Sequence, residues 1–251
     1  MSQEPTNLSA DAIEYITTVK FPAARAAVKL LRDAGVRVIH YGSLGNNDVK
    51  PELRDFFDLD LIVRMEDLDL FSATLEGAGY RMLLDNPHTG TAVEATPEWQ
   101  EHERYAFGGC SAGYALPTKP VPDLWIHFKT TWQHWPLVFV DLSHWFDAAE
   151  TVTVLGDTEI QRAPLWARLL WETDETAQEV RRHHPDARRD LDEVALFARA
   201  PGVDWDLVAE RIVQYDAECV QRQTRLTARV GELGRTTVVA PIPDQKGLVI
   251  N

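Results

Sequence analysis

The chain has 251 residues, of which 45% are hydrophobic and 25% charged, a composition typical of a globular protein with one large domain or two modest ones. Its formal net charge of −14 would repel a phosphate backbone, so extended nucleic acid is not an expected partner. No apolar run approaches the roughly 20 residues of a membrane-spanning helix, and the opening residues lack a basic, then apolar, signal segment. We therefore expect a cytoplasmic protein without membrane contact, and the sequence leaves its oligomeric state open.

Helical and strand patterns alternate through the first part of the chain. Residues 8–34 have helical spacing, with Pro22 in a first-turn position and Gly35 at the end. The later segments are, in order, strands over 36–41 and 56–63, a helix over 67–79, and strands over 81–84, 101–107, 122–129 and 137–142. This order predicts a mixed sheet flanked by helices.

Beyond about residue 150 the period of the apolar residues changes from 2 to 3.6. Helices are expected from Pro164 and over 185–198, 204–212 and 217–233, and the two prolines near the end favour an extended tail. The fold class is therefore α+β. We expect a catalytic domain over 1–150, a helical bundle over 151–235 and a tail over 236–251.

Three aspartates are the main candidates for metal binding. Asp58 and Asp60 are two apart on an expected strand, so both carboxylates project from one face, and Asp141 lies in a later apolar strand. A neighbouring strand can bring a third acid to the same point. Because Mg²⁺ takes one or two carboxylates together with phosphate oxygens, we expect Mg²⁺ here. Asp141 has an alternative role as a buried acid satisfied by backbone donors or an arginine.

A glycine and a serine follow the strand that ends at Tyr41. Gly42 permits a close approach of the backbone, and the Ser43 hydroxyl with nearby N–H groups is suited to phosphate oxygens, although an ordinary turn has the same composition. The sequence contains neither a GxxxxGK[ST] nor a GxGxxG motif, so it lacks the main support for a P-loop or a dinucleotide site.

Three motifs in order carry a family resemblance. They are Val38-Ile39-His40-Tyr41-Gly42-Ser43, then Arg54 with Asp58-Leu59-Asp60-Leu61-Ile62-Val63, then Phe139-Val140-Asp141-Leu142. Together they resemble the signatures of the nucleotidyltransferase superfamily, which has the polymerase-β-type fold. Within it the chain is most similar to bacterial small nucleotidyltransferases related to antibiotic-modifying enzymes. Residues 141–145 and 189–194 add to this likeness, which covers roughly residues 36–213.

The resemblance implies an activity and a set of site residues. Gly42 and Ser43 would hold the phosphates of a nucleoside triphosphate, with ATP the first candidate, while Asp58 and Asp60 would bind Mg²⁺, with two ions expected. In addition, Asp141 would bind metal or deprotonate the acceptor, and Arg54 would neutralise phosphate charge or else pair with Asp55 or Glu52. The implied reaction transfers a nucleoside monophosphate to a hydroxyl or similar nucleophile of a small molecule and releases pyrophosphate.

Other features remain open between two interpretations. His127 and Lys129 share a strand face and are candidates for contact with phosphate or acceptor. An aromatic group either lines an acceptor pocket or belongs to the core: Trp99, Tyr105, Trp132, His134 and Trp135. The acidic charge favours a cationic or neutral acceptor. The alternatives are a nucleotidyltransferase that modifies a protein, as in toxin–antitoxin systems, a silent nucleotide-binding member, and a structural adaptor.

Overall fold

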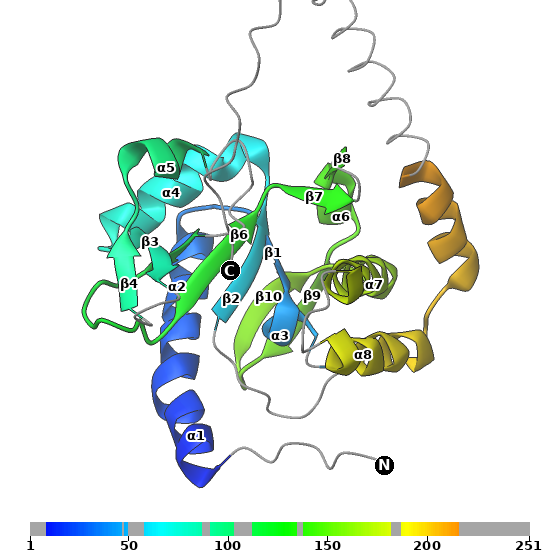
Figure 1. Ribbon diagram of the computed structural model, residues 1–251, viewed down its shortest axis with the longest axis horizontal. Helices are drawn as coiled ribbons and strands as arrows, with labels where there is room; N and C mark the ends of the chain where they lie inside the picture. The colour runs from blue at the N-terminus through cyan, green and yellow to red at the C-terminus, as the bar shows by residue number, and fades with distance from the viewer. Residues whose placement is uncertain are drawn as a thin grey trace, which may run out of the picture.

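The computed structural model describes residues 9–46, 48–49, 58–86, 91–102, 112–134, 138–181 and 187–215 (Figure 1). Within these residues eight strands form one mixed sheet in the order β4-β3-β5-β6-β2-β1-β10-β9, and two more form a separate pair, β7-β8. The strands are β1 Val38–Tyr41, β2 Asp58–Val63, β3 Arg81–Asn86, β4 Thr91–Glu94, β5 Ala112–Ala115, β6 Trp125–Lys129, β7 Thr131–His134, β8 Val138–Asp141, β9 Glu150–Val154 and β10 Thr158–Arg162.

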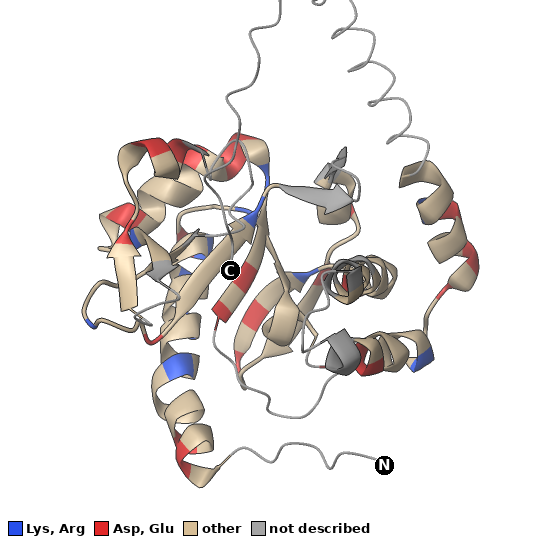
Figure 2. Ribbon diagram, in the orientation of Figure 1, with Lys and Arg blue, Asp and Glu red and all other residues tan. Residues whose placement is uncertain are grey.

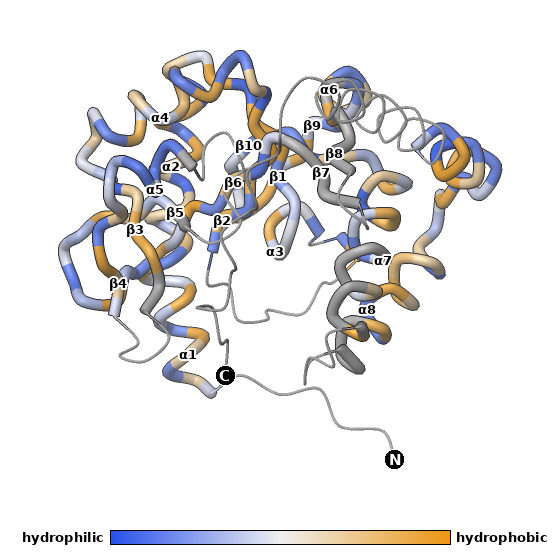
Figure 3. The backbone as a smooth tube through the Cα atoms, turned by 45° about the horizontal axis from the view of Figure 1, so that its top comes forward, coloured by the Kyte–Doolittle hydropathy of each residue, from blue (hydrophilic) through white to orange (hydrophobic). Residues whose placement is uncertain are grey.

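The helices pack on both sides of this sheet. They are α1 Ala10–Tyr15, α2 Phe21–Asp33, α3 Gly42–Gly45, α4 Leu68–Gly77, α5 Pro97–His102, α6 Ser143–Asp147, α7 Leu165–Arg181 and α8 Ala187–Arg199, and residues 205–215 are also helical. Helices α2 and α4 lie on one side of the strands, and α7 and α8 lie on the other (Figures 1 and 3). In the described residues, no helix is long and apolar enough to cross a membrane.

The first helix contains a wide turn just before its proline. A π-helical segment, Ile16–Lys20, joins α1 to α2, and the N–H of Phe21 donates to the carbonyl of Ile16. Pro22 follows directly, and because it lacks an N–H it cannot continue the regular bonding pattern of the turn before it. Gly35, at a φ of +75°, ends the helical region. The sequence prediction of one helical region over 8–34 agrees with this arrangement.

The pairing of the central strands positions the candidate residues. Strand β1 runs antiparallel to β2, with Tyr41 opposite Asp60, and β2 runs parallel to β6, with Asp60 opposite His127. On the other side of β1, strand β10 runs parallel to it, with His40 opposite Arg162. The end of β1, the start of β2 and the start of β6 therefore lie side by side.

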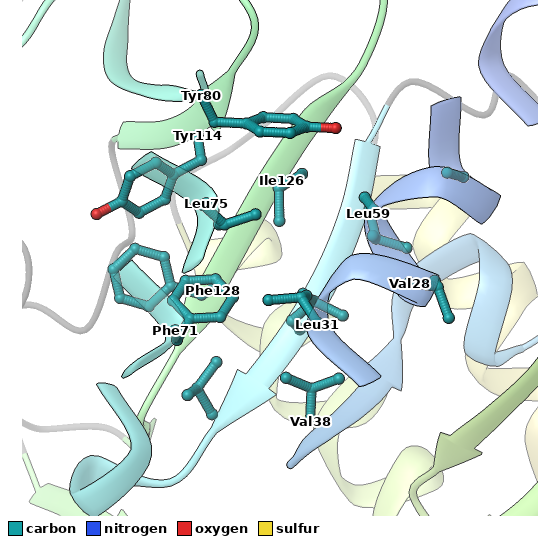
Figure 4. Close-up of a cluster of buried hydrophobic side chains, with 14 of the residues drawn as sticks. Val28, Leu31, Val38, Leu59, Phe71, Leu75, Tyr80, Tyr114, Ile126 and Phe128 are labelled. Carbon is teal, nitrogen blue, oxygen red and sulfur yellow. The ribbon is translucent and has the colours of Figure 1, made fainter. Parts of the chain in front are cut away.

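Each face of the sheet belongs to a different hydrophobic core. Leu59, Leu61 and Val63 of β2 pack with residues of α2 and α4, and Figure 4 shows this first core with Val28 and Leu31 of α2 beside the strands. The second core joins Ile62 of β2 to residues of α6, α7, α8 and residues 205–215. We call these the closed face and the α7 face. Alternation along β2 places Asp58 and Asp60 on the α7 face with Ile62.

Two expectations from the sequence are corrected by the structure. Residues 150–162 form the hairpin β9-β10 instead of starting a helical region, because alternating Thr and Val residues favour strands and Gly156, at a φ of +91°, turns the chain. Residues 97–102 form α5, so the strand expected over 101–107 is wrong at its start, and its remainder lies outside the described residues.

The C-terminal expectations are met where the structure describes them. Helices α7, α8 and 205–215 occur as expected, and Asp204 caps the last of them by accepting a hydrogen bond from the N–H of Leu207 at 3.0 Å. The expected helix over 217–233 and the tail over 236–251 lie outside the described residues. The domain limits therefore remain a prediction.

Candidate active site

Polar side chains gather on the α7 face where β1, β2 and β6 lie side by side. Asp58 and Asp60 come from β2, and His127 and Lys129 come from β6. They line a pocket of about 260 Å³ between the sheet and α7. Its full lining is Tyr41, Gly42, Asn46, Asp58, Asp60, His127, Lys129, Trp145, Ala163, Arg168, Trp171 and Glu172. The acidic bands on β2 lie close to α3 in Figure 2.

The glycine turn after β1 lies directly against one of the two carboxylates. Gly42 has a φ of +62°, which favours glycine, and a Cβ atom there would overlap the carboxylate of Asp60, which would have to move. A Cβ atom on Gly45 would be 2.4 Å from the carbonyl oxygen of His40. Both glycines are therefore required by close packing. Ser43 follows in α3 and is exposed.

A buried arginine of α7 holds the segment that follows this turn. Arg168, whose side chain is 1% exposed, donates from Nη1 to the Gly45 carbonyl at 3.2 Å and to Oδ1 of Asp48 at 2.7 Å, and from Nη2 to Oδ2 of Asp48 at 3.2 Å. Arg162 of β10 lies 2.9 Å from the same carboxylate. Partial burial by itself would raise the pKa of Asp48, but the hydrogen bonds and charges of the two arginines hold this pKa below its usual value.

The other charged groups of the pocket have aromatic or polar neighbours. Nζ of Lys129 lies 4.5 Å from the ring centre of Trp171 and 5.4 Å from that of Tyr41, so two ring faces attract its charge. Nε2 of His127 lies 3.8 Å from Oδ2 of Asp58, and these side chains are 30% and 38% exposed. The Asp58 carboxylate is therefore within reach of molecules that enter the pocket.

The two carboxylates fit a Mg²⁺ ion. Oxygen donors are the ligands that Mg²⁺ prefers, and it commonly binds through one or two carboxylates with water and phosphate completing its shell. The nitrogen of His127 suits transition metals better than Mg²⁺. In the part of the chain that the structure describes, no group of three His, Cys, Asp or Glu residues converges on one point. Among the described residues, Asp58 and Asp60 are therefore the candidate ligands for such an ion.

The structure brings some of the predicted residues together. Gly42, Asp58 and Asp60 line the same pocket, and Ser43 is next to it in the chain. Arg54 lies outside the described residues. The strand of Asp141, β8, pairs with β7, and Asp141 stands opposite Thr131. The strands that neighbour β2 are β1 and β6. Nothing is described of the Asp141 side chain, so its convergence with the other two acids stays a prediction.

Of the predicted aromatic group, only the side chain of Trp99 lies in the described residues. Trp99 lies on α5 and is 39% exposed. The side chains of Tyr105, Trp132, His134 and Trp135 lie outside the described part. The aromatic residues that do line the pocket are Tyr41, Trp145 and Trp171.

Sequence reasoning missed the contribution of α7. Arg168 and Glu172 are spaced i, i+4 on a helix that begins with mostly apolar residues, which indicates a polar stripe on one side. That stripe signals a functional or buried polar face. The partner of Arg168, Asp48, lies 120 residues earlier in the chain, so no local pattern indicates this pair.

Comparison with known proteins finds similarity in structure only. No family model and no curated protein matches the sequence. The antibiotic-resistance factor ANT(2'')-Ia aligns with a TM-score of 0.42 at 11% identity, over 88% of this chain and 99% of that one. The lincosamide antibiotic adenylyltransferase LnuA aligns with a TM-score of 0.36 at 14% identity, over 77% and 99%. An antigenic nucleotidyltransferase-like protein from Paracoccidioides brasiliensis aligns with a TM-score of 0.39 at 13% identity, over 85% and 93%.

The chain is similar to solved structures whose names include an adenylyltransferase and a nucleotidyltransferase-like protein. At 10–14% identity and TM-scores of 0.36–0.42, this likeness says nothing about what the chain does. What the pocket does is therefore inferred from its own residues.

Proposed function

We propose that the protein is a Mg²⁺-dependent nucleotidyltransferase that moves a nucleoside monophosphate, with ATP as the first candidate donor, to a hydroxyl or similar nucleophile of a small molecule. One observation carries the proposal. The glycine turn after β1 touches the Asp60 carboxylate, and Asp58 and Asp60 face the same pocket. A turn that is suited to phosphate and a carboxylate pair that is suited to a metal ion are thus in contact, although 15 or more residues separate them in the chain.

Each described group has a defined role in this proposal. Gly42 lets the backbone approach the phosphates, and Ser43 offers its hydroxyl. Asp58 and Asp60 hold Mg²⁺, which neutralises charge on the phosphate oxygens when bound. Lys129 supplies a further positive charge in the pocket. Arg168 keeps the turn in place through Gly45 and Asp48. Arg54 and Asp141 keep the roles that the resemblance implies.

The chemistry is a displacement at the α-phosphorus. The acceptor oxygen forms a bond to this phosphorus, and the bond to the oxygen bridging the α- and β-phosphorus atoms breaks. Pyrophosphate leaves with that bond's electron pair, and the acceptor's proton passes to a base or to water. Such transfers depend mainly on positioning and on charge stabilisation. A pair of partly exposed carboxylates, which supplies oxygen ligands for a metal ion, is suited to positioning and stabilising the transferred group.

The acceptor is proposed to be a small molecule, cationic or neutral. The pocket has a volume of about 260 Å³, and besides Asp58 and Asp60, which Mg²⁺ would occupy, it carries the Glu172 carboxylate of α7. A compound with amines and hydroxyls complements such a pocket. Tobramycin and lincomycin, the ligands named with ANT(2'')-Ia and LnuA, are suitable first compounds to try.

A thermal-shift panel of the four nucleoside triphosphates, with and without Mg²⁺, is the first test. A ligand that binds the folded state raises the melting temperature, so one triphosphate with Mg²⁺ is expected to raise it and Mg²⁺-free samples to respond less. Triphosphate binding that does not depend on Mg²⁺, together with no pyrophosphate release in the presence of any acceptor, would identify a silent nucleotide-binding member. A mass increase on a partner protein would identify a protein-modifying enzyme.

The carboxylate pair is tested by substitution. Asp58→Asn and Asp60→Asn are expected to lower pyrophosphate release by about 100-fold or more, because neutral amides hold Mg²⁺ poorly, while the melting temperature is kept. Asp157→Asn is the matched control, since this carboxylate is 83% exposed and lies outside the pocket. Normal pyrophosphate release by Asp60→Asn would contradict the proposal.

A further inference from the structure

Two stacked rings lie on the β6 side of the carboxylate pair. Trp125 stands opposite Asp58 in the pairing of β6 with β2, and His127 stands opposite Asp60. The ring centres of Trp125 and His127 are 5.9 Å apart, with an angle of 16° between the planes. Between them in sequence, Ile126 is buried in the core of the closed face. The two rings therefore share the α7 face with the carboxylates.

A glycine of the next strand makes room for these rings. A Cβ atom on Gly113 of β5 would lie 3.0 Å from Cε3 of Trp125 and 3.1 Å from Cε1 of His127. The neighbouring Tyr114 is buried in the core of the closed face, so Gly113 faces the same side as the rings. The rings occupy space that a side chain would otherwise take. We call Trp125, His127 and Gly113 the ring platform.

The ring platform remains accessible at the edge of the pocket. The side chain of His127 is 30% exposed and lines the pocket, and Trp125 is of intermediate exposure. Partly exposed aromatic faces next to a reactive centre are well suited to bind the flat face of a ring or a cation. The platform thus has a surface to offer to a ligand that reaches Asp58.

The positions of the strands assign a side to each substrate. In transfer at phosphorus the attacking and leaving oxygens lie roughly in line, on opposite sides of the phosphorus. If the phosphates rest on the glycine turn, the leaving pyrophosphate is on the β1 side of Asp60. Strands β1 and β6 flank β2 on opposite sides. The acceptor therefore approaches from the β6 side, where the ring platform lies.

We propose that the ring platform binds the acceptor and selects a small molecule whose attacking hydroxyl is carried by a ring. The face of that ring packs against the exposed side of this ring pair, which directs the hydroxyl toward Asp58. This inference rests on the proposed function, because it takes the position of the phosphates from it. It adds the residues that hold the acceptor and the kind of acceptor that they hold.

Binding measurements with defined probes test the platform without turnover. Glucosamine and tobramycin serve as ring probes and serinol as an open-chain probe, each titrated by calorimetry into the full chain with Mg²⁺ and α,β-methylene-ATP. The wild type is expected to bind at least one ring probe more tightly than serinol. Trp125→Ala is expected to weaken that binding by about 10-fold, as is typical for loss of a stacking contact, and Trp125→Phe to restore most of it.

A second variant separates loss of stacking from loss of folding. Gly113→Val adds a side chain under the rings without removing either one, and it is expected to weaken the ring probes about as much as Trp125→Ala does. In both variants the affinity for Mg²⁺ with α,β-methylene-ATP should stay within about 2-fold of the wild type. Melting curves establish that each variant is folded.

The outcomes distinguish this inference from the proposed function. If the wild type binds no ring probe, or prefers serinol, or if a folded Trp125→Ala binds the ring probes normally, the ring platform is not the acceptor site. If Trp125→Ala weakens the nucleotide analogue and spares the ring probes, the platform holds the nucleobase instead. If the wild type does not bind the nucleotide analogue at all, the proposed function itself fails.

Discussion

The two faces of the sheet differ although the same strands build both. On β2, Leu59 and Leu61 are 0% exposed in the core of the closed face, whereas Asp58 and Asp60 line a pocket on the α7 face. Helices α2 and α4 complete an apolar core on the first face. On the second, α7 brings Arg168 and Glu172 to the pocket beside its apolar residues. Residues adjacent in the chain thus contribute to a hydrophobic core on one face and to a pocket on the other.

This division has a physical reason. A strand directs successive side chains to opposite faces, so one strand can keep one face continuous and apolar while the other carries charge. The apolar face supplies free energy through burial, which offsets the cost of placing like charges close together on the other. Changes on either face should therefore separate activity from stability.

The largest expected effect comes from filling the contact between the glycine turn and the carboxylate. In Gly42→Ala the new methyl group would displace Asp60 from its position, and pyrophosphate release is expected to fall by about 100-fold, as small misplacements at reactive centres can cause. Gly35→Ala is the matched control, because Gly35 also has a positive φ but has nothing within 4 Å of an added Cβ.

The control separates backbone strain from the lost contact. Gly35→Ala is expected to lower stability by about 1–2 kcal/mol and to leave the activity of the folded protein unchanged. Equal activity losses in the two variants would show that strain alone, and not the displacement of Asp60, explains the effect of Gly42→Ala.

A change on the closed face should act on stability alone. Leu61→Ala removes a fully buried side chain from the core of the closed face and is expected to lower the free energy of unfolding by about 2–5 kcal/mol in urea titrations. Affinity for the Mg²⁺-nucleotide should be retained at temperatures where the variant is folded. Substitution of the adjacent residue, Asp60→Asn, is expected to lower activity and to keep stability. Its stability should equal or exceed that of the wild type, because the repulsion between residue 60 and Asp58 is weaker. A Leu61→Ala variant with wild-type stability would break the distinction between the faces.

A smaller effect is expected from a histidine on the closed face. Burial lowers the pKa of His40 to about 4, against the Nδ1 hydrogen bond to the carbonyl of Gln161, which raises it. The unfolded chain takes up a proton near the usual value of 6.5, so stability is present above this pH and is lost as the pH falls from 6.5 toward 4. Between pH 7.5 and pH 5 the loss is about 2 kcal/mol.

This pH dependence is measured by urea unfolding of the wild type and His40→Gln at both pH values. The variant is expected to lose most of the difference, although its stability at pH 7.5 is also lower because the hydrogen bond changes. Asp48 does not affect stability in this pH range. Its pKa lies below the usual value of 3.8, so the stability that it contributes is lost only at lower pH. An unchanged pH slope in His40→Gln would assign the effect to other groups.

The sequence predicts the residues of the site that depend on local patterns. Alternation around Asp58 and Asp60 indicates a strand with both acids on one face, and the glycine that ends the preceding strand indicates a tight turn. These patterns are local, because side-chain direction in a strand depends only on position. The prediction of a mixed sheet flanked by helices follows from the same order of patterns, and the structure agrees with it.

Local sequence patterns do not indicate which residues far apart in the chain come into contact. Arg168 meets Asp48 only because α7 crosses the sheet near β1, and nothing near either residue indicates the other. The hairpin β9-β10 does have a local signal in its alternating Thr and Val residues, which the change to helical spacing further along obscures. The position of β6 beside β2 also depends on the topology of the sheet, because several strands have sequence patterns that would suit this position.

The pairing of β1 with β10 has a consequence for how the chain folds as it is made. Strand β1 can pair with β2 soon after both are synthesised. Its other neighbour, β10, contains Arg162, which pairs with His40 and is synthesised much later. At typical rates of translation, the roughly 120 intervening residues take on the order of ten seconds to emerge. Until then the hydrogen-bonding edge of β1 stays open, and the arginines that hold Asp48 do not yet exist. The nascent protein therefore gains its pocket only after β10 and α7 have been synthesised.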